Sequence, residues 1–304
     1  MLSEHRVHIA YDETRVVYDL GGKPDGPTVV LCDGLGCDGF IWKYLLEDLQ
    51  KEYRLIHPNY RGHGRSQIPS NPDHMTIQDH CRDLLGILDE QGVDQCVLIG
   101  HSMGVQTILE FTHRNPKRVA SLVTICGSYG RVLDTFHDSS TLRNIFPHAV
   151  SLIQKHSNLG GQIWKFLARN PASWPLAKLL EVNAELAHRE DVMPYFNHLA
   201  RMNPRIFMNA LQSASQHSAL SFLRDLNTPT LIIAGERDQF TPKWLSEKMN
   251  MHLSESELVI ANGASHIAPL ESPKEINSEI IRFLAEQIGT GANASKANNG
   301  KETG

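Results

Sequence analysis

The chain has 304 residues, of which 41% are hydrophobic, and a net charge of -5. This composition supports one large hydrophobic core and excludes a disordered or fibrous chain, and without a long basic run it argues against a nucleic-acid partner. No apolar stretch approaches the roughly 20 residues of a membrane-spanning helix, and the charged N-terminal residues lack the apolar core of a signal peptide, so we expect a cytoplasmic protein without an integral membrane segment.

Short runs rich in β-branched residues mark the first part of the chain. They lie at residues 6–11, 15–20, 28–34, 54–59, 96–100 and 121–126. Only three residues separate the first two runs, which predicts an antiparallel hairpin. From residue 28 onward the runs lack strict polar alternation and are interleaved with helical patterns. We therefore expect parallel strands that are covered by helices on both faces.

The strand pattern stops at about residue 130 and returns at residues 230–236 and 257–261. Between these points apolar residues recur at helical spacing, which predicts an all-helical insertion. The last segment is rich in Gly, Asn and Lys and carries no large apolar residue, as is typical of a disordered tail. We predict a core over residues 1–129 and 228–288, a helical cap over residues 130–227, and a disordered tail over residues 289–304.

A nucleophile motif follows the strand at residues 96–100. Gly100, His101, Ser102, Met103 and Gly104 stand between this strand and an amphipathic helix, which is the context of a nucleophile elbow. The two glycines allow the strand and the helix to approach closely, and the turn exposes the serine hydroxyl. The helix start directs N–H groups at the reaction centre, where an oxyanion would develop. Ser102 is therefore the candidate nucleophile, and the Met103 N–H is a candidate oxyanion donor.

A serine nucleophile needs an imidazole base that is oriented by a carboxylate. In hydrolases with such an elbow the acid and then the base follow the serine along the chain. Asp238 lies in the loop after the strand at residues 230–236, and His266 lies in the loop after the next strand. We predict these two as acid and base, with Glu236 as the competing acid. His101 is expected to pack or to hydrogen-bond locally.

The loop after the third strand reads Asp33-Gly34-Leu35-Gly36, and residues 59–66 read NYRGHGRS. With the elbow and the two partner loops, these segments resemble the α/β-hydrolase superfamily, in particular its lidded esterase, lipase and lactonase branch. The resemblance covers residues 6–288. It implies an α/β fold with a mostly parallel eight-stranded sheet, helices on both faces and an inserted helical cap. It also implies that the Leu35 N–H is the second oxyanion donor.

Two positions depart from the pattern of this superfamily. Asp33 stands where relatives commonly have His, and Asn59 stands where they have Asp. A carboxylate that faced the oxyanion would raise the barrier, so Asp33 should point elsewhere. We predict that it pairs with Arg61, because the two loops are adjacent in the fold that the chain resembles. Asn59 is expected only to cap or to turn the chain.

The resemblance implies a serine hydrolase that cleaves a carboxylic ester, as a carboxylesterase or lipase does, through an acyl-serine. Large cap side chains favour a small-molecule ester with an apolar acyl group: Trp164, Phe166, Trp174, Phe196, Phe207 and Met208. A lactonase, thioesterase, carbon-carbon bond hydrolase, perhydrolase or acyltransferase with the same triad stays possible, as does a ligand-binding receptor that has lost turnover. The sequence identifies neither the natural substrate nor the oligomeric state.

Neither a metal nor an organic cofactor is predicted. The five cysteines are an odd number without framework-like spacing, and no second pair completes a zinc site with Cys32 and Cys37. We expect all five to be reduced and structural.

Overall fold

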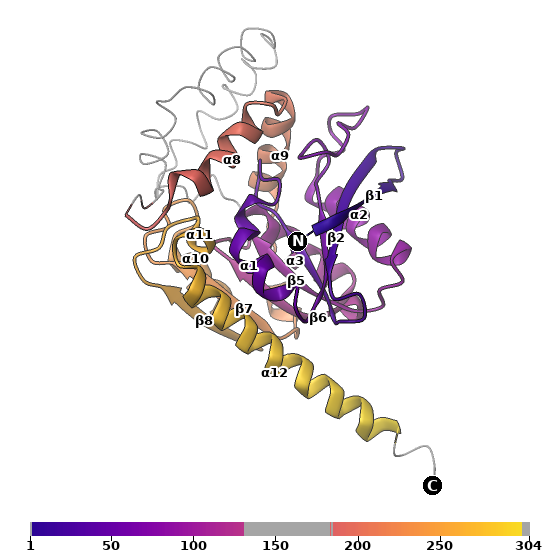
Figure 1. The fold of residues 1–304 in the computed structure, drawn as a ribbon, viewed down its shortest axis with the longest axis vertical. Coiled ribbons are helices and arrows are strands. Elements are labelled where there is room, and N and C mark those ends of the chain that lie inside the picture. The colour runs from indigo at the N-terminus through magenta and orange to yellow at the C-terminus, as the bar shows by residue number, and fades with distance from the viewer. Residues whose placement is uncertain (1, 131–182, 184, 300–304) are drawn as a thin grey trace.

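The structure, a computed structural model, describes residues 2–130, 183 and 185–299. Its centre is an eight-stranded sheet with the strand order β1-β2-β4-β3-β5-β6-β7-β8 (Figure 1). The strands are β1 (Leu2–Ile9), β2 (Arg15–Gly22), β3 (Thr28–Cys32), β4 (Arg54–Pro58), β5 (Cys96–His101), β6 (Val119–Ile125), β7 (Thr230–Gly235) and β8 (Ser256–Ala261). The pairs β1/β2 and β2/β4 are antiparallel and the other pairs are parallel. The predicted hairpin and the mostly parallel sheet are confirmed.

Helices cover both faces of the sheet. The core helices are α1 (Lys43–Leu49), α2 (Ile77–Glu90), α3 (Met103–Arg114), α10 (Lys243–His252), α11 (Ala268–Glu271) and α12 (Pro273–Asn299), with 3-10 turns at Phe40–Trp42, Pro116–Arg118 and Leu223–Asp225. Val30 and Cys32 of β3 pack with α2, α3 and α10, whereas Val29 and Leu31 pack with α1 and α12. Because both faces of the strand are buried, its sequence is continuously apolar.

The described part of the predicted cap is helical. It contains α8 (Arg189–Leu199) and α9 (Pro204–Gln216), which lie together at one end of the molecule (Figure 1). Asn203 caps α9 by accepting a hydrogen bond from the Arg205 N–H, and Pro204 occupies the first helical position, where no N–H is needed. Of the predicted cap side chains, Phe196 lies on α8 and Phe207 and Met208 lie on α9.

The cap residues Trp164, Phe166 and Trp174 lie outside the described residues. The predicted boundaries of the cap and the core therefore stay predictions.

The C-terminal segment differs from its prediction. Helix α12 continues to Asn299 and projects away from the body of the molecule (Figure 1), so residues 289–299 are helical where the sequence predicted a disordered tail. Two features favour this continuation: the segment contains no proline, and each residue added to an existing helix gains a hydrogen bond without a new nucleation cost.

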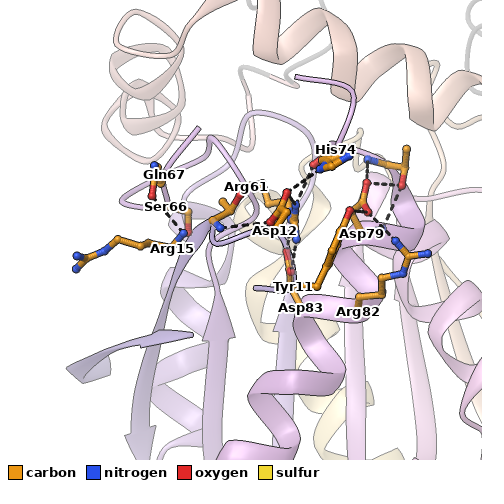
Figure 2. Close-up of polar contacts among 12 residues, drawn as sticks. Tyr11, Asp12, Arg15, Arg61, Ser66, Gln67, His74, Asp79, Arg82 and Asp83 are labelled. Atoms are coloured by element: carbon orange, nitrogen blue, oxygen red, sulfur yellow. Dashed lines mark hydrogen bonds and ion pairs between the residues drawn. The ribbon is translucent and has the colours of Figure 1, made fainter. Parts of the chain in front are cut away.

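Arg61 lies in a buried ion-pair network that joins three segments of the core. Its side chain is fully buried, and its Nε and Nη2 atoms donate to the two carboxylate oxygens of Asp83 on α2 at 2.6 and 2.7 Å. Its Nη1 donates to Asp12 at 2.7 Å and to the carbonyl oxygen of His74 at 3.3 Å (Figure 2). The predicted pair between Arg61 and Asp33 is therefore wrong. Both ends of the guanidinium are occupied by carboxylates of the β1–β2 turn and of α2.

Replacing Arg61 with alanine is expected to lower the free energy of unfolding by about 3–5 kcal/mol, because it leaves the buried Asp83 carboxylate without its cation. Urea unfolding of the wild type and Arg61→Ala at neutral pH measures the change. Arg82→Ala is the matched control, since that arginine is 61% exposed and makes one ion pair, at 3.2 Å, with Asp79. Equal, small losses in the two variants would show that the buried network does not stabilise the fold.

Candidate active site

Ser102 occupies the sharp turn between β5 and α3. Its backbone angles are φ 55° and ψ -116°, which are strained for a residue with a side chain. The surrounding chain fixes this turn, since the Ser102 N–H donates to the Ile125 carbonyl on the neighbouring strand at 3.1 Å. A Cβ atom on Gly104 would lie 2.1 Å from the Cys32 carbonyl oxygen, so only glycine allows the helix start to approach β3 this closely.

Three predicted residues form one chain of hydrogen bonds. The His266 Nε2 lies 2.9 Å from the Ser102 Oγ, and the His266 Nδ1 lies 2.9 Å from an Asp238 carboxylate oxygen. Because a carboxylate only accepts, Nδ1 carries the proton and Nε2 is free to accept one from the serine hydroxyl. The Asp238 side chain is fully buried, whereas His266 and Ser102 are partly exposed. The arrangement leaves the hydroxyl accessible to a bound molecule.

Asp238 is held in place by a residue that the sequence analysis missed. The Thr241 N–H donates to one Asp238 oxygen at 2.9 Å, and the Thr241 hydroxyl donates to the other at 2.7 Å. An Asp followed three residues later by Thr, before a proline, is a recognisable turn signal that could have found this contact. Glu236, the competing acid, is exposed and accepts from the Gly263 N–H at 2.8 Å. It does not contact His266.

A second carboxylate supports the loop that carries His266. Glu271 accepts hydrogen bonds from the Ser265 N–H at 2.5 Å and from the Ser265 hydroxyl at 2.7 Å. It also accepts from the Asn183 N–H at 2.7 Å. Burial raises the pKa of Glu271, and these donors oppose that rise. The residue directly before His266 is thereby fixed.

His101 forms a local contact, as predicted. Its Nε2 donates to the carbonyl oxygen of His266 at 2.9 Å. Burial, together with the neighbouring His266, lowers the pKa of His101 to about 4. The imidazole is therefore neutral at pH 7 and connects the elbow to the loop that carries His266.

The loop at residues 33–36 lies against the elbow. A Cβ atom on Gly34 would lie 3.1 Å from the Ser102 Cβ, so the residue directly before Leu35 lies against the nucleophile. Met103 is the first residue of α3, so its N–H has no acceptor within the helix. Met103 and the loop that carries Leu35 thus both lie beside Ser102, and the role of their N–H groups as oxyanion donors stays a prediction.

Apolar side chains of the cap border this loop. A Cβ atom on Gly36 would meet the Leu199 side chain at 2.7 Å, Phe207 at 3.1 Å and Tyr195 at 3.4 Å. On the other side of the site, the Phe240 ring centroid lies 5.0 Å from that of His266. Apolar side chains therefore lie beside the loop at residues 33–36 and beside the His266 ring.

Asp33 points away from the serine, but not toward Arg61. One of its carboxylate oxygens accepts from the Trp42 indole N–H at 2.6 Å, and the other lies 2.9 Å from the His57 Nε2. The side chain is 1% exposed. Asn59 does turn the chain, since its Oδ1 accepts from the Arg65 N–H at 3.2 Å, but it does more than the prediction allowed, since its amide also donates to the buried Asp19 at 3.3 Å.

Among the described residues, no group of three or more His, Cys, Asp or Glu side chains could hold a metal ion. All five cysteines are free and buried. Within the same part of the chain, no helix is both long and apolar enough to cross a membrane.

Comparison with known proteins identifies related hydrolases. The family model described as alpha/beta hydrolase fold matches residues 27–273. A Stutzerimonas stutzeri protein named as a carbamate hydrolase, RutD, is 26% identical over 285 residues, which cover 90% of this chain and 97% of the relative. The 3-oxoadipate enol-lactonase 1 of Acinetobacter baylyi is 25% identical and covers 84% and 88% of the two chains. The crystal structure of a hydrolase from Pseudomonas aeruginosa has a TM-score of 0.75 at 21% identity and covers 93% and 99%.

Proposed function

Because the chain belongs to the alpha/beta hydrolase fold family, we propose that it is a serine hydrolase that cleaves carboxylic esters through an acyl-serine intermediate. Ser102 is the proposed nucleophile, His266 the base and Asp238 the acid. The observation that carries this proposal is the continuous hydrogen-bonded chain from the Ser102 Oγ through His266 to Asp238. Such a chain activates a hydroxyl that would otherwise be a weak nucleophile.

In the proposed reaction, the His266 Nε2 accepts the Ser102 proton while the serine oxygen bonds to the ester carbonyl carbon. The carbonyl oxygen becomes an oxyanion, for which the N–H groups of Met103 and Leu35 are the proposed donors. Cleavage of the carbon–oxygen bond releases the alcohol, which takes the proton from His266. Water then attacks the acyl-serine by the same proton route and releases the acid.

The apolar residues around the site favour a small ester with an apolar acyl group. Leu199 and Phe207 approach the loop that carries Leu35, and Phe240 approaches His266. A buried apolar surface near the serine stabilises an apolar chain more than a polar one.

A series of p-nitrophenyl esters with increasing acyl chain length tests this function. We expect hydrolysis by the wild type and none above background by Ser102→Ala. Activity that is confined to the shortest chains would contradict a lipase-like pocket. Full activity in the variant would contradict the mechanism.

Two relatives favour a second candidate, the hydrolysis of another acyl bond. One is the 3-oxoadipate enol-lactonase 1 of Acinetobacter baylyi, and the other is the Stutzerimonas stutzeri protein that is named as a carbamate hydrolase. The same three residues could open a lactone, whose leaving oxygen stays tethered to the acyl group. A kcat/KM for an enol-lactone that exceeds the value for every ester of the series would favour this candidate.

The free cysteines support a reducing compartment, such as the cytoplasm, for this enzyme.

A further inference from the structure

Two departures from the superfamily pattern, Asp33 and Asn59, meet in one buried network. His57 lies opposite Asp19 in the antiparallel pairing of β2 and β4. Its Nε2 contacts Asp33 at 2.9 Å and its Nδ1 lies 3.5 Å from Asp19. The Asn59 amide donates to the same Asp19 oxygen at 3.3 Å. A carboxylate in place of this amide would face Asp19 directly, so the amide at position 59 fits a network that already contains two carboxylates.

His57 is the imidazole of this network that lies between both carboxylates. Burial by itself would lower the pKa of His57, but Asp33 and Asp19 raise it to about 10. Behind Asp19 lie Arg65, which is ion-paired to it, and His5, whose Nδ1 lies 2.5 Å from it. When His57 and Arg65 are both positive, their two charges neutralise the carboxylates of Asp33 and Asp19.

The remaining charged group near His57 is Asp38, in the loop between β3 and α1. Burial raises the pKa of Asp38, as does the neighbouring Asp33, whereas His198, Arg201 and His57 lower it. Asp38 also contacts His198 of the cap at 3.3 Å. Burial thus outweighs the nearby cations, and the pKa of Asp38 stays above its ordinary value.

The network lies directly beneath the loop that would bind the oxyanion. Asp33 precedes Gly34, whose Cα lies against Ser102, and the Asp33 carbonyl oxygen would lie 2.8 Å from a Cβ atom on Gly104. Trp42, which donates to Asp33, also packs edge-on against His101, next to the nucleophile. A change in the charge or the position of Asp33 would therefore shift the proposed oxyanion donors, which are only one or two contacts away.

We infer that His57 is a positioning residue for the proposed reaction: as an imidazolium it neutralises Asp33 and holds the 33–36 loop so that this loop can stabilise negative charge. The inference rests on the proposed function of Ser102. It explains how a carboxylate is tolerated next to an oxyanion donor. Without the imidazolium, Asp33 would oppose the charge that develops in the transition state.

A double-mutant cycle tests the charge balance. His57→Gln keeps a donor toward Asp33 but removes the positive charge, and we expect kcat to fall about 10- to 100-fold while KM changes little. Asp33→Asn combined with His57→Gln removes both charges, and we expect it to recover most of the lost kcat. A double variant no more active than His57→Gln would overturn the inference, because a merely structural role predicts no recovery.

The protonation state of His57 is measured without substrate. Histidine NMR, with the His57 ring assigned through its own backbone resonances in the wild type, should show a charged ring up to about pH 10. In Asp33→Asn the ring should lose its proton at lower pH, because one of its two carboxylates is gone. A His57 ring that is neutral at pH 8 in the wild type would overturn the inference, even if His57→Gln fails to fold.

The pH dependence has a definite sign. The pKa of His57 is raised above the ordinary value of about 6.5. The positive charge of His57 therefore stabilises the folded protein fully below about pH 6.5, and this stabilisation is lost as the pH rises toward about 10. The wild-type kcat should fall over the upper part of this range, and that of the doubly neutral variant should not. Failure of this inference is distinct from failure of the proposed function, which would appear as activity in Ser102→Ala.

Discussion

Ser102→Ala is expected to lower kcat/KM for a p-nitrophenyl ester by about 10⁴-fold or more. The variant removes the oxygen that lies 2.9 Å from the His266 Nε2, so no acyl-enzyme can form. Any remaining rate would come from the oxyanion donors and from binding, with water as the nucleophile. Steady-state kinetics on variants of equal folded fraction, judged by circular dichroism, give the comparison.

Ser121→Ala is the matched control, since this serine is fully buried on β6 and does not belong to the site. It should retain activity near the wild-type value. If Ser102→Ala kept more than a few per cent of the wild-type rate, the nucleophile would be a residue other than Ser102.

Asp238→Asn is expected to lower kcat by about 10⁴-fold with little loss of folding stability. The asparagine oxygen can keep the bond from the Thr241 N–H, but its amide nitrogen, in place of the oxygen that faces His266, can donate to the His266 Nδ1. The ring proton then moves to Nε2, which can no longer accept the proton of Ser102. The rate constant should fall far more than KM changes, because binding of the substrate does not depend on this tautomer.

Glu236→Gln separates this effect from a general change of charge near the loop. Glu236 lies two residues away on the same loop, is exposed, and contacts Gly263 rather than His266. We expect its kcat to stay within about twofold of the wild type. Equal losses in the two variants would contradict the role of Asp238 as the partner of the base.

The elements of the core could be predicted because they depend on local patterns. The β3 residues Val29 to Cys32 are apolar without alternation, and this pattern already indicates burial on both faces. Likewise, Ser102 lies at a turn for which the flanking glycines and the preceding strand are sufficient signals. The positions of Asp238 and His266 follow from chain order and from their places after two parallel strands.

The partners of Asp33 could not be predicted in this way. Its contact with His57 depends on the order of the strands in the sheet, because β4 lies between β2 and β3 and brings His57 between Asp19 and Asp33. No local pattern encodes this order. Arg61 was assigned to the wrong carboxylate for a similar reason, since its contact with Asp83 depends on how α2 packs on the sheet.

The most direct test of the account is to label the nucleophile covalently. Incubation with a fluorophosphonate, which reacts with activated serines, followed by digestion and mass spectrometry, identifies the modified residue. We predict one equivalent of label per chain on the peptide that contains Ser102, with loss of ester hydrolysis in proportion to labelling, and little label in His266→Ala. Label on a different residue, or complete inhibition with Ser102 unmodified, would contradict Ser102 as the nucleophile.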